Sequence, residues 1–272
     1  MAVSRAVSGC SSGREAWSST RVPPSLALVA AASLIPLASS AEDPAGASGS
    51  FGLGLEFGPA WFSSNDVRIP GDDGTKFDML DLTGEGPDFF ARAEAWWDID
   101  EKHGLRLVLA PLEVSGTGNL DRDTEFAGSS FPAGRTKGTY NFSTYKLTYR
   151  YTLKDEGAWR WRVGITGLIR DANVELRQED LKDNNDDIGF VPLLHVSGDY
   201  SFANRWRLTF DFDGLAGGPG RAFDVAARID HDLGRHWRVG AGYRMLEGGV
   251  DTDSTYNFAW IHYGVISAQY RF

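Results

Sequence analysis

Apolar and polar side chains alternate with a period of two along most of this 272-residue chain, from Phe51 to the last residue. Phe51, Leu53 and Leu55 share one face, for example, while Gly52 and Gly54 share the other. This period is typical of β-strands that separate an apolar environment from a polar one. No apolar run is long enough for a membrane-spanning helix, and the mean hydropathy of −0.29 is that of alternating strands, whose two faces cancel.

Ten alternating segments follow one another, each about the length that a tilted strand needs to cross a bilayer. We therefore expect an all-β fold, an antiparallel transmembrane β-barrel of ten strands, or of eight if two segments are not strands. An even number leaves both ends of the barrel on the periplasmic side. The segments lie at 51–61, 89–97, 105–110, 145–151, 159–170, 194–202, 206–213, 223–230, 237–244 and 257–272.

The connections between these segments alternate in length. Short polar turns are expected at 98–103, 152–157, 203–205 and 232–235. Longer loops rich in Gly, Asp, Asn and Ser are expected at 63–87, 115–138, 171–187 and 247–254, with a tight exception at 217–220. Short turns on one side and long loops on the other are typical of outer-membrane barrels.

Aromatic residues of the apolar face gather close to the short turns. A barrel would align them as a girdle at one membrane boundary, whereas a soluble sandwich has no reason to hold them at one height. The predicted girdle consists of Trp97, Tyr151, Trp159, Trp206, Trp237 and Tyr270.

The first 41 residues are expected to form a signal peptide, leaving 42–272 as the barrel. Arg5, Arg14 and Arg21 give a positive leader, and an apolar run at 26–38 precedes small residues before Glu42. Without the leader the chain has no cysteine and a formal charge near −12. This charge argues against nucleic acid as a partner.

The inward face is densely charged. Folding each hairpin about its turn predicts three cross-strand ion pairs, Glu94–Arg106, Asp199–Arg207 and Asp230–Arg238. In the remaining hairpin Arg150 would face Arg162 and would need an acid from another strand. Side chains of this size would largely fill a ten-stranded lumen, so we expect a structural or narrow-pore role for a largely charge-plugged barrel.

A catalytic alternative rests on four inward residues of the outer half. Asp211, Asp213 and Asp224 should converge, with His195 on the preceding strand, and a carboxylate–His group can activate water. Neutralising arginines nearby favour a barrel that is not an enzyme. The histidines lack zinc spacing and the chain has no nucleotide motif, so neither a metal nor a cofactor is expected.

A lipid-modifying enzyme is a second catalytic alternative, and it needs a nucleophile beside a histidine. His262 points outward by phase, but its outward neighbours on the same strand are Trp260, Gly264 and Ile266, none with a hydroxyl. We therefore interpret His262 as a side chain of the outer interface.

The chain resembles the small outer-membrane β-barrels of Gram-negative bacteria. The resemblance is carried by the leader, the ten segments and the end of the chain at 268–272, where Tyr270 and Phe272 are similar to the signal that barrel-assembly machinery reads. Stretches at 189–195, 221–225 and 242–249 also resemble an uncharacterised porin-like group. The resemblance implies a monomer in the cell outer membrane, with lipid, lipopolysaccharide and the assembly machinery as partners. Omptin-type proteases are ten-stranded barrels with an Asp/His site, but only the composition is similar here.

Overall fold

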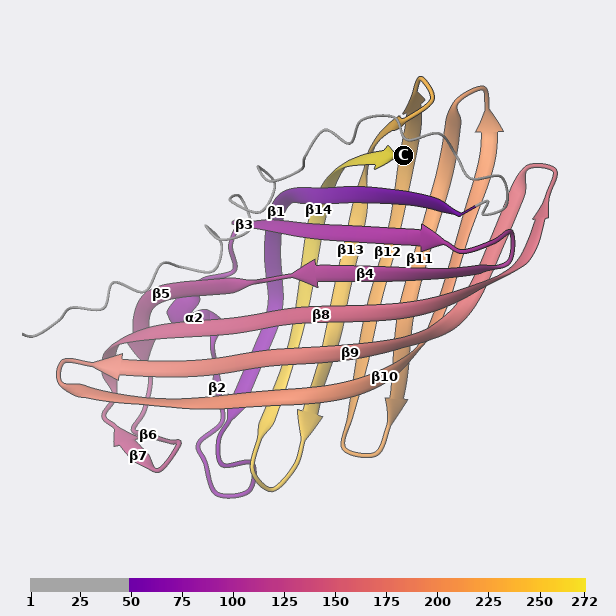
Figure 1. The fold of residues 1–272 in the computed structure, drawn as a ribbon. Coiled ribbons are helices and arrows are strands. Elements are labelled where there is room, and N and C mark those ends of the chain that lie inside the picture. Colours follow the sequence, from indigo (N-terminus) through magenta and orange to yellow (C-terminus); the bar gives the residue numbers. More distant parts are fainter. Residues whose placement is uncertain (1–48) are drawn as a thin grey trace, which may run out of the picture. The chain divides into compact units, whose positions relative to one another are not determined.

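A computed structural model describes residues 49–272, and the predicted signal peptide lies outside them. Ten antiparallel barrel strands follow one another around a ring, which is closed because the last strand pairs with the first (Figure 1). Each predicted segment corresponds to one barrel strand, so the ten-stranded prediction is confirmed and the eight-stranded alternative is wrong. The ring consists of β1 (Ser50–Arg68), β3 (Asp88–Asp98), β4 (His103–Ala110) continued by β5 (Glu113–Leu120), β8 (Gly134–Glu156), β9 (Trp159–Gln178), β10 (Leu181–Ala203), β11 (Trp206–Gly217), β12 (Gly220–Leu233), β13 (Trp237–Asp251) and β14 (Tyr256–Arg271).

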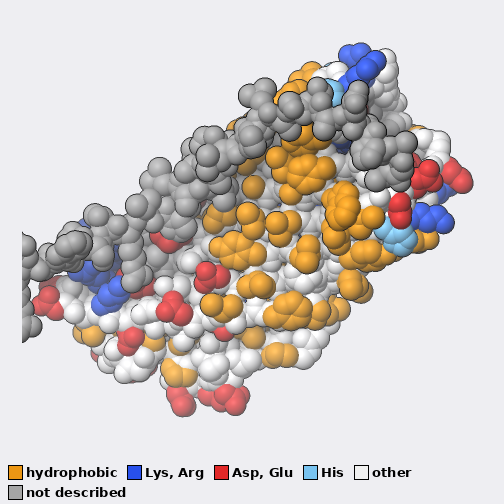
Figure 2. Space-filling model, in the orientation of Figure 1, with side chains coloured by type: hydrophobic (Ala, Val, Ile, Leu, Met, Phe, Trp, Pro, Cys, Tyr) orange, Lys and Arg blue, Asp and Glu red, His pale blue; other side chains and the backbone are white. Residues whose placement is uncertain are grey.

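The outside of the ring is apolar over its middle. Figure 2 shows hydrophobic side chains gathered in a band, with charged ones towards the two ends. Several large side chains of this band are strongly exposed, among them Phe89 at 73%, Phe190 at 71% and Ile165 at 64%. Water would oppose such exposure, whereas the hydrocarbon of a bilayer solvates it. No helix among residues 49–272 is long and apolar enough to cross a membrane.

Two of the predicted outer loops are instead extensions of strands. β8, β9 and β10 continue as paired strands well past the end of β4 (Figure 1), so the expected loop at 171–187 is wrong, as is much of that at 115–138. The polar run Asp183–Asp187 lies within β10, paired with β9. On the β10 side of this arm residues 182–187 are polar at every position, so this stretch lacks the alternation that identifies a membrane strand. The β9 side does alternate, and its Val174 and Leu176 are buried in the interior.

The outer half of the ring holds an apolar cluster that the charged pattern did not predict. Its core combines inward side chains of β1, β8, β9 and β14 with residues of four short elements. These elements are β2 (Phe77–Asp78), α2 (Leu80–Thr83), β6 (Thr124–Phe126) and β7 (Ser129–Phe131). We call this cluster the apolar cap; its most buried members include Phe62, Met79, Leu82, Phe126, Phe131, Tyr140, Leu176 and Ile261.

Two contacts of Tyr140 cross the interior of the ring within the apolar cap. Its ring meets that of Phe62 edge to face, with centroids 6.1 Å apart. Its hydroxyl donates a hydrogen bond to Asn257 Oδ1 at 3.0 Å. Tyr140 lies on β8, whereas Phe62 and Asn257 lie on β1 and β14, which are not neighbours of β8 in the ring. Tyr140 therefore joins β8 to β1 and β14 across the interior at this level.

Candidate functional site

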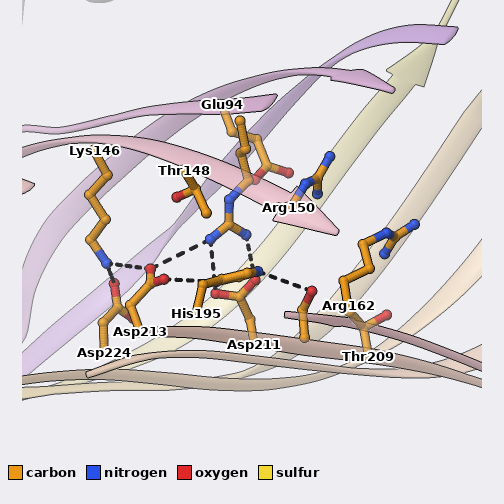
Figure 3. Close-up of polar contacts among 12 residues, drawn as sticks. Glu94, Lys146, Thr148, Arg150, Arg162, His195, Thr209, Asp211, Asp213 and Asp224 are labelled. Atoms are coloured by element: carbon orange, nitrogen blue, oxygen red, sulfur yellow. Dashed lines mark hydrogen bonds and ion pairs between the residues drawn. The ribbon is translucent and has the colours of Figure 1, made fainter. Parts of the chain in front are cut away.

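A cluster of buried charges occupies the middle of the barrel, where register brings three of the predicted residues into one row. His195, Asp213 and Asp224 are direct neighbours across β10, β11 and β12. Lys146 reaches this row from β8, with its ammonium 3.0 Å from Asp213 Oδ2 and in contact with Asp224 (Figure 3). All four side chains are at most 4% exposed. The lysine therefore bridges Asp213 and Asp224, and it was not among the predicted site residues.

Further ion pairs extend this cluster around the ring. Asp224 also contacts Arg244, and it accepts a hydrogen bond from Arg92 Nη1 at 2.9 Å. Asp211 is bound by both terminal nitrogens of Arg106. Glu56, which was not among the predicted site residues, is the acid shared by Arg92, Arg228 and Arg244. Charges withdrawn from water in this way are stable only when they are paired and hydrogen-bonded.

This pairing decides whether the predicted carboxylate–His group is available to activate water. The structure brings His195, Asp211 and Asp213 so close that one ligand atom of each lies within 4.8 Å of the others, a spacing that could hold a metal ion. However, Arg106 already neutralises Asp211, and Lys146 neutralises Asp213. A metal ion or a catalytic water would have to displace a cation, so these residues fit neither role well.

His195 also links an acid to a hydroxyl. Its Nδ1 lies 2.8 Å from Asp213 Oδ1, and its Nε2 lies 3.1 Å from Ser197 Oγ. The order of groups is that of a Ser-His-Asp triad. His195 and Asp213 are buried, and Asp213 is also bound by Lys146 and by the Thr166 hydroxyl. We interpret the arrangement as satisfied polar packing.

The three predicted cross-strand ion pairs are wrong. Arg106 lies opposite Trp96 rather than Glu94, and Asp232 rather than Asp230 lies opposite Arg238. The predicted Asp199–Arg207 pair is also absent, because Asp199 binds Arg162 and Arg207 binds Asp232. Each hairpin turns one residue later than assumed, which moves every partner by two positions. A shift of two keeps a side chain on its face, so all six residues still point inward.

The periplasmic half of the interior is rich in arginine. A cavity of about 80 Å³ widens into a mouth of about 710 Å³, and Arg150, Arg162 and Arg271 line both. Arg150 does not lie opposite Arg162, and Asp98 of β3 supplies its acid at 3.3 Å. At the rim, backbone N–H groups of Lys102 and His103 hold the pKa of Asp100 below its usual range.

The residues of the predicted girdle lie at the end of the barrel that carries the short turns. Trp97, Trp159, Trp206 and Trp237 are 41–52% exposed. Their rings contact other aromatic rings at this end: Trp159 stacks on Tyr200 with centroids 4.4 Å apart, and Trp237 meets Tyr270 edge to face at 5.0 Å. Tyr151 packs against His103 at 5.3 Å. Phe272 contacts Phe51 and Tyr270 at the same end.

A second polar group lies on the outside of the ring, where β14 meets β1. His262 Nε2 lies 2.9 Å from Ser63 Oγ, and His262 Nδ1 contacts the hydroxyl of Tyr243 on β13. The outward neighbours of His262 on its own strand carry no hydroxyl, but Ser63 on β1 and Tyr243 on β13 each bring one to it, so the interpretation of His262 as an isolated interface residue is wrong. Ser63 lies on β1, at the other end of the chain, and comes beside His262 only because β1 pairs with β14. The neighbours along β14 alone therefore could not predict this contact.

Comparison with known proteins bears on the fold. No protein-family model matches the chain, and no curated protein matches it. Among solved structures it is similar to the outer-membrane protease OmpT of Escherichia coli, with a TM-score of 0.52 and 9% identity over 85% of this chain and 99% of OmpT. Weaker matches include the Yersinia pestis protein Ail (TM-score 0.37, 7% identity, 83% and 99% covered) and the β domain of Bordetella BrkA (TM-score 0.41, 14% identity, 83% and 100% covered).

The fold is that of an outer-membrane β-barrel. The closed ring, the outward apolar band and the similarity to OmpT all indicate a barrel that spans the outer membrane. The expected location in the bacterial outer membrane is therefore confirmed. An identity of 9% shows only the fold, and protease activity does not follow from it.

Proposed function

We propose that this protein is a closed outer-membrane barrel with a structural role, whose lumen does not conduct ions. Two layers support the proposal. The buried charges around Lys146 are paired across the centre, and the apolar cap packs inward side chains of β1, β8, β9 and β14 together in the outer half. A cavity of about 410 Å³ lies beside these two layers, and Lys146, Asp224 and Phe190 are among the residues that line it. The observation that carries the proposal is Tyr140, which is fully buried and contacts Phe62 and Asn257 across the ring. A water-filled channel would expose such an inward side chain to solvent.

Planar-bilayer recording tests the proposal directly. The purified mature barrel should give no stable conductance steps, and replacement of Tyr140 and Phe62 by Ala should produce them or raise the current noise. A matched control replaces two large outward residues of the apolar band, Phe190 and Ile165, by Ala and should stay silent. Reproducible open steps from the unmodified protein would contradict the closed lumen and favour a narrow pore.

A further inference from the structure

We propose that Ser63 and His262 form an outward-facing hydrolytic site that cleaves acyl esters of outer-leaflet lipids. Three of its properties carry the proposal: the geometry of the hydrogen bonds, the height of the site on the barrel, and the outward position of Ser63 at a β-bulge. The proposal is independent of the closed lumen, because the site lies on the other side of the wall.

The hydrogen bonds suit a serine activated by histidine. With Nδ1–H of His262 donating to the Tyr243 hydroxyl oxygen, the Nε2 lone pair is free to accept the Ser63 proton across 2.9 Å. A nucleophile, a base and a third group that orients the base are the parts that such catalysis needs. Ser63 is exposed and His262 is half-buried, so an acyl chain lying against the barrel can reach the hydroxyl.

The height of the site matches the position of lipid ester bonds. Phe51 marks the periplasmic aromatic ring, and Ser63 lies twelve residues further along β1. At about 3.3 Å per residue and a tilt of about 40°, the two are separated by about 30 Å along the membrane normal. The apolar band of such barrels is about 25 Å tall. Ser63 therefore lies just beyond its outer edge, where acyl chains join their headgroups.

Two neighbouring rings support this placement. Trp61 and Trp260 are 40% and 42% exposed, and Trp260 stacks on His262 with centroids 5.6 Å apart. Tryptophan is enriched at the level of lipid headgroups, because one part of its ring is apolar and another is polar. The site thus lies within an outer aromatic belt, opposite the girdle at the short-turn end.

Ser63 faces the lipid at a β-bulge. Trp61 is exposed and Phe62 is buried, so alternation along β1 turns Ser63 outward. Phe62 pairs with Ile261 and Ser64 pairs with Trp260, so Ser63 is the extra residue between them. Asn65 is buried again, which strict alternation from Phe62 would not allow. Bulges are frequent beside active sites, and this one leaves Ser63 out of the ladder that pairs β1 with β14.

The reaction follows from these groups. Ser63 Oγ attacks the acyl carbonyl carbon while its proton passes to His262 Nε2. The ester C–O bond then breaks, the alcohol leaves with that proton, and an acyl-serine remains. Water from the interface gives a proton to His262 Nε2 and its oxygen adds to the acyl carbon. The bond between that carbon and Ser63 Oγ then breaks, His262 returns the proton to Oγ, and the fatty acid is released. Tyr243 is a positioning residue, because it touches the base and not the substrate.

Fatty-acid release from detergent-solubilised full-length mature barrel tests the proposal, with lipopolysaccharide and phosphatidylethanolamine micelles as two separate substrates. Ser63→Ala and His262→Ala should each lower the rate at least about 1,000-fold. Tyr243→Phe should lower kcat by about 10-fold with KM unchanged, since it removes only the group that orients the imidazole. Ser64→Ala, one residue away, is the matched control and should keep full activity.

Labelling with a fluorophosphonate and mapping of the modified peptide give an independent readout. Modification of Ser63, together with fatty-acid release from either lipid, supports the site. The lipid from which fatty acid is released identifies the substrate class. Release that survives Ser63→Ala, release that is lost in Ser197→Ala instead, or no release from both lipids by folded protein would each overturn it. Retained heat-modifiable migration on electrophoresis shows that each variant is folded.

Discussion

Removal of the Lys146 ammonium should destabilise the barrel more than the loss of any exposed charge. In Lys146→Met, Asp224 keeps Arg92 and Arg244, but Asp213 loses the nearer of its two cations and keeps only Arg106, whose Nη2 lies 3.5 Å from Oδ2. Breaking a buried ion pair from one side costs roughly 3–5 kcal/mol when the remaining charge has no other partner. Because Asp224 stays paired and Asp213 keeps Arg106 and the His195 and Thr166 hydrogen bonds, we expect a loss of about 2–3 kcal/mol, at or just below that range.

The measurement is the free energy of unfolding in urea, followed by tryptophan fluorescence of the protein refolded into lipid vesicles. Lys137→Met is the matched control, because Lys137 lies on the same strand but is exposed, and its change should stay within about 0.5 kcal/mol. The double variant Lys146→Met/Asp213→Asn should recover at least half of the loss, since no carboxylate is then left without its nearest cation. If Lys146→Met lowers the free energy of unfolding no more than Lys137→Met does, the buried acids do not need the lysine as a partner and the reasoning is refuted.

Two further variants test the ends of the barrel. Phe126→Ala should cost about 3–5 kcal/mol and open the outer end to limited proteolysis, because Phe126 is fully buried and packs on Phe131 with centroids 6.2 Å apart; an unchanged cleavage pattern would argue against a packed cap. Trp159→Leu keeps apolar area but loses the stack on Tyr200, so it should cost about 0.5–1.5 kcal/mol in vesicle unfolding. No loss there would mean that the girdle acts through apolar area alone.

The sequence predicts the strands and the direction of their side chains because a period of two does not depend on where each turn lies. The register between neighbouring strands does depend on the exact position of the turn. The partners of Arg106 and Arg238 were missed since alternation tells which way a side chain points but not which residue lies beside it. The outer arm of β10 was missed because residues 182–187 are polar at every position, although the alternation of β9 continues through Val174 and Leu176.

The candidate sites show a second limit of sequence reasoning. Lys146 could be recognised as inward, but its position between Asp213 and Asp224 depends on contacts across the ring between β8 and strands three and four places away. Ser63 has the outward phase of Trp61, but it lies beyond the predicted segment 51–61, in a stretch that was expected to be a loop. Its proximity to His262 joins residues 199 positions apart.

The apolar cap draws on both the first and the last strand of the ring, through Phe62 of β1 and Ile261 of β14. Its packing is therefore complete only after the two ends of the chain have met. Closing the cylinder and sealing its outer end become one cooperative event, so a barrel stalled with an open seam would also have an unsealed outer end and an unassembled Ser63–His262 pair. Resistance to an externally added protease would then report when assembly has finished.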